Sequence, residues 1–72
     1  MSTSRFAICI QNNASEDLEL RKVYEVIPDG SAEREGYVRI IDESGEDYLY
    51  PASYFIPIEL SDEAKEALLM AA

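Results

Sequence analysis

The hydrophobic positions of this chain fall into short segments separated by polar turns, which is the pattern of a small β protein. Most of these segments are rich in β-branched and aromatic residues, and several show the alternation of a strand with one buried face. No segment before the last dozen residues has the period of a helix long enough to cover a sheet. The predicted strands are 5–11, 18–27, 36–42, 47–50 and 55–60.

Turn-forming residues separate the predicted strands. Pro28 stops the second strand because proline has no N–H to give to a ladder. Residues 43–46 have the chemistry of a tight turn, with Gly45 at the position that needs a positive φ. Pro51 ends the fourth strand, and residues 52–54 have the length of one helical turn. The chain therefore predicts a hairpin followed by a short helical connection.

The last residues change character and predict a helix. Ser61 is a good N-cap, and Asp62 and Glu63 suit the positive end of a helix dipole. One apolar stripe follows at helical spacing: Ala64, Ala67, Leu68 and Ala71. Because an isolated helix of this length is marginal in water, it docks on its own sheet, docks on a partner, or frays. The predicted organisation is one β domain over 1–60 with a helix over 61–72.

The order of these elements, and the residues within them, resemble an SH3 barrel. The run Tyr-Pro-Ala-Ser-Tyr-Phe at 50–55 is the most similar, since it looks like the closing turn of that family. Weaker similarities stand in the expected order along the chain, at 7–11, 16–22, 24–27, 36–39 and 44–46. The chain is also similar to small uncharacterised bacterial proteins of SH3-like fold. The resemblance implies an all-β, SH3-like barrel of about five strands with a short C-terminal helix.

The resemblance also implies a binding surface. The peptide groove of the SH3 family is built from aromatic residues, to which Pro51 and Tyr54 correspond directly. Tyr37 stands where the family has a tryptophan, and Glu16 and Asp17 stand where it has an acidic loop. These five residues are the predicted partner-binding site.

The sequence departs from the family at the first strand. Cys9 and Gln11 replace the tyrosines that contribute to the groove, and the chain has no tryptophan. Part of the aromatic groove is therefore missing, and polyproline recognition, which needs an aromatic-lined groove, does not follow from the resemblance.

Charge and composition narrow the function further. Six basic residues against fifteen acidic ones give a net charge of −9, which disfavours binding to nucleic acid or to anionic membranes. An acidic surface instead steers a basic partner, or simply keeps the protein in solution. No apolar run is long enough to span a bilayer, and we expect a cytoplasmic protein.

Catalytic and metal chemistry find little support in the residue types. A chain with no histidine and with Cys9 alone has no Ser–His or Cys–His pair and no disulfide. The acidic residues of 42–47 flank a predicted hairpin tip and lack the ligand spacing of a calcium loop. We expect no enzyme, no cofactor and no metal site.

The sequence thus predicts a non-enzymatic protein-interaction module that binds a basic or apolar protein segment. Two alternatives stay open. The chain is a small structural or regulatory subunit attached through its C-terminal helix, or an acidic mimic of nucleic acid that occupies a DNA-binding protein.

Overall fold

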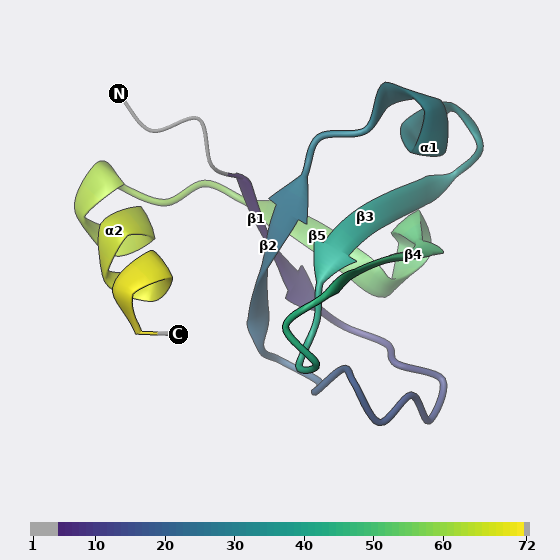
Figure 1. The fold of residues 1–72 in the computed structure, drawn as a ribbon, viewed down its shortest axis with the longest axis horizontal. Coiled ribbons are helices and arrows are strands. Elements are labelled where there is room, and N and C mark those ends of the chain that lie inside the picture. The colour runs from purple at the N-terminus through teal and green to yellow at the C-terminus, as the bar shows by residue number, and fades with distance from the viewer. Residues whose placement is uncertain (1–4, 72) are drawn as a thin grey trace.

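Five antiparallel strands form one sheet in the computed structural model, which describes residues 5–71 (Figure 1). The strands are β1 (Arg5–Cys9), β2 (Val23–Ile27), β3 (Tyr37–Ile41), β4 (Asp47–Pro51) and β5 (Phe55–Ile58). The helices are α1 (Gly30–Arg34), the 3₁₀ turn η1 (Ala52–Tyr54) and α2 (Asp62–Met70). The prediction of a mostly β chain with five strands and a C-terminal helix is confirmed.

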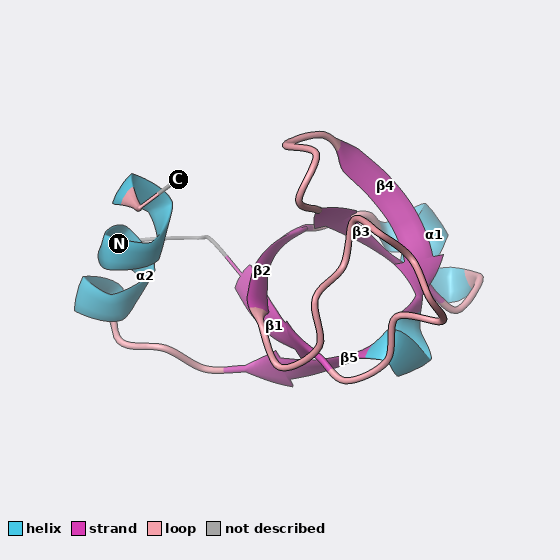
Figure 2. Cartoon of the chain, turned by 90° about the horizontal axis from the view of Figure 1, so that it is seen from below, coloured by secondary structure: helices cyan, strands magenta, loops and turns pink. Residues whose placement is uncertain are grey.

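The sheet curls strongly but does not close. Its strand order is β4-β3-β2-β1-β5, and Figure 2 shows these strands bent round into a curl. Among the described strands, β4 and β5 are the two edges and do not pair with each other. Pro51 ends β4 and Pro57 lies within β5, so each of these strands lacks one N–H that a ladder needs. The sequence resemblance led us to expect a barrel, and the strand pairing gives an open, curled sheet.

The core fills the inside of the curl. Its buried residues come from every strand except β4, and from the loop after β1: Ala7, Cys9, Leu18, Tyr24, Ile40 and Phe55. Tyr50 of β4 packs against this cluster, with its ring centroid 6.2 Å from that of Phe55. The Cys9 side chain is fully buried, and this burial raises the pKa of its thiol, so Cys9 is a packing residue.

The second predicted strand is shorter than the sequence pattern suggests. Pairing begins only at Val23, although Leu18 is buried in the core. Arg21 has a φ of 67°, which turns the chain between these two residues. Leu18 is therefore an anchor of the β1–β2 loop and not a strand residue.

Helix α1 was not predicted, because Pro28 and Gly30 mark the segment as a turn. Asp29 is its N-cap, and the carboxylate accepts the N–H of Ala32 at 3.1 Å. The side chain of Glu33 reaches back to the N–H of Asp29 at 3.3 Å. Buried Ala32 attaches the helix to the sheet. The short helix places acidic side chains beside the start of β3.

Helix α2 begins as predicted and stands to one side of the sheet (Figures 1 and 2). The Ser61 hydroxyl caps it by accepting the N–H of Ala64 at 3.1 Å. None of its residues is buried. No helix within residues 5–71 has the length and apolar character needed to cross a membrane.

Candidate functional site

The predicted site has its centre where β3 begins and β4 ends. Tyr37 and Pro51 are direct partners across the β3–β4 ladder, so their side chains lie on the same, outer face. The N–H of Ala52 donates to the carbonyl of Gly36 at 2.9 Å and fixes this end of the ladder. Tyr37 is 44% exposed. The structure thus brings together two of the five predicted residues and leaves a tyrosine ring open to solvent.

A shallow hollow of about 410 Å³ adjoins Tyr37 on the side of α1. Its other lining residues come from α1, its cap and the outer face of the ladder: Asp29, Ser31, Ala32, Glu35, Arg39 and Leu49. Leu49 is 46% exposed, and it lies opposite Arg39 across the ladder. The hollow therefore combines an aromatic ring and an aliphatic side chain with an acidic rim.

Arg39 forms ion pairs with two carboxylates. Its guanidinium donates to Asp29 Oδ2 at 2.9 Å and to Asp47 Oδ2 at 2.8 Å. The bonds to Asp47 and Asp29 raise the pKa of Arg39. The Ala32 N–H and the guanidinium together lower the pKa of Asp29, so that it stays ionised. The arginine ties α1 to β3 and β4 and is not a free cation in the hollow.

Tyr54 contributes mainly to the core. It lies in η1, and its ring is half-buried against the core cluster. Its carbonyl accepts the N–H of Ile10 at 2.8 Å, which joins η1 to the end of β1. Only part of this side chain is left to meet a partner.

Glu16 and Asp17 lie near the opposite end of the β3–β4 ladder. The Asp17 carbonyl accepts the N–H of Glu43 at 2.9 Å, beside the β3–β4 hairpin. Four residues of strand, or about 13 Å, separate that end from Tyr37. Both acidic side chains are exposed. The structure therefore does not bring Glu16 and Asp17 into one surface with Tyr37.

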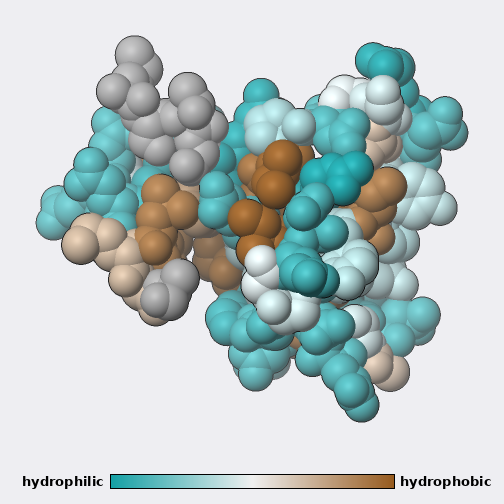
Figure 3. Space-filling model, in the orientation of Figure 1, coloured by the Kyte–Doolittle hydropathy of each residue, from teal (hydrophilic) through white to brown (hydrophobic). Residues whose placement is uncertain are grey.

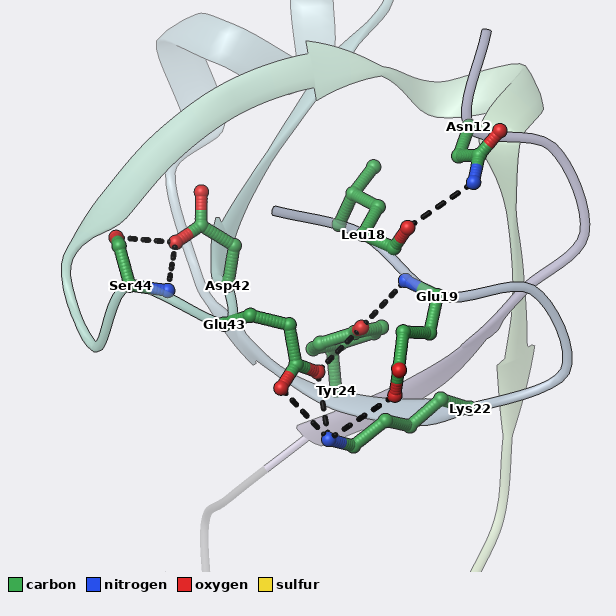
Figure 4. A network of polar contacts seen from close by, with 8 residues as sticks. All are labelled: Asn12, Leu18, Glu19, Lys22, Tyr24, Asp42, Glu43 and Ser44. Atoms are coloured by element: carbon green, nitrogen blue, oxygen red, sulfur yellow. Dashed lines mark hydrogen bonds and ion pairs between the residues drawn. The ribbon is translucent and has the colours of Figure 1, made fainter. Parts of the chain in front are cut away.

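A polar cluster holds the β1–β2 loop to the hairpin (Figure 4). The Tyr24 hydroxyl accepts the N–H of Glu19 at 2.7 Å and donates to Glu43 Oε2 at 2.6 Å. Lys22 Nζ lies 2.8 Å from Glu43 Oε1. Burial of the hydroxyl and its bond to Glu43 raise the pKa of Tyr24, while Lys22 and then Tyr24 lower the pKa of Glu43. We call Tyr24, Glu43 and Lys22, with Asp42, Ser44 and Tyr50, the hairpin cluster.

Asp42 is the buried acid of the hairpin cluster. One carboxylate oxygen accepts the Ser44 N–H at 2.9 Å and the Ser44 hydroxyl, and the other accepts the Tyr50 hydroxyl at 2.5 Å. Burial alone would raise the pKa of Asp42, but the bonds from Ser44 and Tyr50 outweigh it and lower the pKa. Burial of the Tyr50 hydroxyl and its bond to Asp42 raise the pKa of Tyr50 to about 12.

The hairpin cluster is built for structure. Its hydroxyls and carboxylates are bonded to one another, and no buried side-chain nitrogen or oxygen within residues 5–71 is without a partner. A general acid or base needs a proton position open to substrate, which the paired Asp42 does not have. In the same part of the chain, no group of three acidic or cysteine side chains is placed to hold a metal ion.

Sequence reasoning missed two residues of the site, Leu49 and Glu35. Leu49 carries a signal in the alternation of β4, because it must face away from Tyr48 and Tyr50. Glu35 ends α1, a helix that the sequence did not reveal. Comparison of the chain with protein-family models, with curated proteins and with solved structures found no significant match. The case for function therefore depends on the geometry of this surface.

Proposed function

We propose that the protein is a cytoplasmic, non-enzymatic interaction module with an SH3-like fold whose sheet is left open. It binds a basic or apolar protein segment across the surface of Tyr37, Pro51 and Tyr54. The strand order, the antiparallel pairing and the position of η1 between β4 and β5 support the fold assignment.

The observation that carries the functional proposal is the pairing of Tyr37 with Pro51 beside Leu49. Two large side chains, each almost half exposed, flank a proline on one face of the ladder. A tyrosine gives wide contact area at low entropic cost and has a hydroxyl suited to the wet edge of an interface. Such a surface offers an apolar contact of the kind found at binding hot spots.

The surrounding charge favours a basic partner. Glu35 lies on the rim of the hollow that contains Tyr37, and the chain as a whole carries a charge of −9. Glu16 and Asp17, farther along the ladder, add to the same field. In this proposal they raise the rate of encounter with a basic segment, and the aromatic surface supplies the contact.

The test is affinity capture followed by comparison of variants. Tagged protein captures a partner from its native cell, and binding is then measured for the double variant Tyr37→Ala, Tyr54→Ala. Tyr48→Ala is the matched control, because Tyr48 is 48% exposed on the same hairpin near its turn. We expect the double variant to lose at least about tenfold in affinity, or about 1.4 kcal/mol. Equal loss in the Tyr48→Ala control would contradict the proposal.

A second candidate function follows from α2. None of its residues is buried, although its sequence is strongly helix-forming, so it is available to attach the protein to a larger complex. Truncation after Leu60 distinguishes the two candidates. Loss of the partner with an intact fold favours attachment through α2, whereas retained binding favours the Tyr37 surface.

A further inference from the structure

The free edge of β4 turns backbone hydrogen-bonding groups away from the sheet. In an antiparallel pair, alternate residues bond to the neighbouring strand, and the residues between them direct their N–H and carbonyl groups away from it. The Asp42 N–H donates to the Glu46 carbonyl at one end of the β3–β4 ladder. The Ala52 N–H donates to the Gly36 carbonyl at the other end, so the even-numbered residues are the bonded ones. The odd-numbered residues of β4 therefore face the free edge: Asp47, Leu49 and Pro51.

Leu49 lies at the centre of this edge. Within residues 5–71, no group bonds to its N–H or to its carbonyl. Asp47, Tyr48 and Leu49 are consecutive strand residues, and all three are exposed. The described chain thus leaves this stretch of β4 open to solvent. A strand edge with unpaired donors and acceptors is a template on which another strand can pair.

The other free edge of the sheet, on β5, is closed to such pairing. The N–H and carbonyl of Cys9 are bonded on the β2 side, so its partner on β5, Phe55, directs its own groups outward. Pro57 lies two residues farther along and faces outward as well. The Phe55 N–H already donates to the Ala52 carbonyl, and proline has no N–H to give. The edge of β5 therefore offers no free donor at these two residues, whereas the edge of β4 does.

The charge of the protein indicates which kind of strand the edge of β4 accepts. Figure 3 shows a face that is mostly hydrophilic, and acidic residues outnumber basic ones by fifteen to six. Glu46 and Asp47 lie at the hairpin end of the edge, where Arg39 pairs with Asp47, and the side chains of Leu49 and Pro51 farther along are apolar. The net charge of −9 attracts a basic segment. It also makes two copies of this chain repel one another, which disfavours pairing between two β4 edges.

We propose that a basic, extended segment of a partner protein adds to this sheet as a sixth strand, antiparallel to β4 and centred on Leu49. The added residue opposite Leu49 exchanges two hydrogen bonds with it, and the residue two positions earlier donates to the Pro51 carbonyl. An apolar side chain opposite Leu49 packs on the outer face, and a basic side chain two residues later lies beside the acidic hairpin. This inference rests on the proposed interaction function and adds the way in which the partner is held.

The test uses a synthetic peptide of about eight residues, mostly threonine, with one valine placed two residues before a lysine. Hydrogen exchange of the Leu49 amide is measured in the ¹⁵N-labelled full chain with and without the peptide. We expect this amide to exchange freely in the protein alone and at least about tenfold more slowly with saturating peptide. Slow exchange in the protein alone would overturn the proposal, because the edge would then already be covered by this chain or by a second copy.

The matched control is the same peptide with a methyl group on the backbone nitrogen of its valine. This peptide keeps every side chain and loses the N–H that donates to the Leu49 carbonyl. It should bind at least about tenfold more weakly, as measured by amide chemical shifts. Equal binding of the two peptides overturns the proposal, as does the absence of binding by the unmethylated peptide at about 1 mM.

Two proline variants of this chain test the direction of the N–H groups along β4. Leu49→Pro removes an N–H that faces the free edge, so we expect a folded protein that binds the peptide at least about tenfold more weakly. Tyr48→Pro removes an N–H that bonds to β3, so we expect it to lose most of its stability in urea denaturation. Unchanged peptide binding by a folded Leu49→Pro variant overturns the proposal, as does an equal loss of stability in both variants.

The captured partner separates this inference from the proposed function. A partner that depends on Tyr37 and Tyr54 but leaves the Leu49 amide freely exchanging supports the interaction function and overturns strand addition. A partner that slows exchange at Leu49 and is unaffected by the double variant Tyr37→Ala, Tyr54→Ala supports strand addition and contradicts the Tyr37 surface.

Discussion

The two ends of the β3–β4 ladder differ in what their side chains do. At the hairpin end, Asp42 accepts the hydroxyl of Tyr50, which reaches along the ladder from its position beside Pro51. The Glu43 carboxylate there is shared between Tyr24 and Lys22. At the other end, Tyr37 pairs with Pro51 and keeps its ring almost half exposed. The acidic hairpin, which has more ionisable groups, therefore holds the fold together. The less polar end stays open to solvent, and it is the end where we propose that a partner binds.

The largest expected effect is at Asp42. Asp42→Ala removes the acceptor of two hydroxyls and one N–H and leaves the Tyr50 hydroxyl without its partner. We expect a loss of about 3 kcal/mol in the free energy of unfolding, measured by urea denaturation. A domain of this length has a total stability of only about 4–10 kcal/mol, so the loss is a large part of it. A loss below about 1 kcal/mol would show that the hairpin cluster is not structural.

Removal of one hydroxyl should have a smaller effect. Tyr50→Phe keeps the ring against Phe55 and deletes only the bond to Asp42. We expect a loss of about 2 kcal/mol, because a hydrogen bond to a buried carboxylate is stronger than an average one. The double variant with Asp42→Ala should lose less than the sum of the two single losses, since both remove the same bond. Strict additivity would contradict the pairing.

Acid should weaken the hairpin cluster as well. The folded-state pKa values of Asp42 and Glu43 lie below their unfolded values of about 4, so the unfolded chain binds more protons in acid. Their contribution is complete above the unfolded pKa and is lost as the pH falls through the folded values. Urea midpoints measured from pH 7 down to about pH 2 should fall below about pH 4, and Asp42→Asn should flatten that fall. An equal fall in Asp42→Asn would assign it to other acids.

The stability of the folded protein at alkaline pH depends on Tyr50. Its pKa is raised to about 12 in the folded protein, against about 10 in the unfolded chain. The stability that this shift contributes is present below pH 10 and is lost as the pH rises toward 12. Because the pKa of Tyr24 is raised as well, ultraviolet titration of the tyrosines should show Tyr50 and Tyr24 titrating late, and Tyr50→Phe should remove one of these two late titrations. An unchanged titration curve would contradict the buried bond.

The smallest effect on stability is expected at the open end. Tyr37→Ala removes a half-exposed ring with no role in the core, and we expect a loss of about 1 kcal/mol or less. Partner binding should nevertheless fall at least about tenfold. A large loss of stability would show that Tyr37 is a packing residue. The Tyr37 end of the β3–β4 ladder would then be structural, like the hairpin end.

Local sequence signals predicted the elements better than their arrangement. Alternation and turn residues located the strands and the left-handed Gly45, and Ser61 marked the start of α2 correctly. Helix α1 was not predicted because Pro28 and Gly30 lie at its start, although Asp29 and Glu33 carry its capping signal. The hairpin cluster could not be predicted, since Tyr24 and Glu43 meet only through the register of the sheet.

For the candidate site too, the sequence predicted individual residues better than their arrangement in space. Tyr37 and Pro51 were expected on one surface, and the ladder makes them direct partners. The distance of Glu16 and Asp17 from that pair depends on the path of the β1–β2 loop, which no local pattern specifies. The open edge between β4 and β5 likewise depends on pairing over the whole sheet.

One measurement tests the difference between the two ends most directly. Amide chemical shifts of the ¹⁵N-labelled protein are recorded as the captured partner is added. We expect the largest changes at residues 35–39 and 49–54, around Tyr37 and Pro51, with little change at residues 42–47. Changes concentrated at residues 42–47, with the Tyr37 end unaffected, would contradict the account.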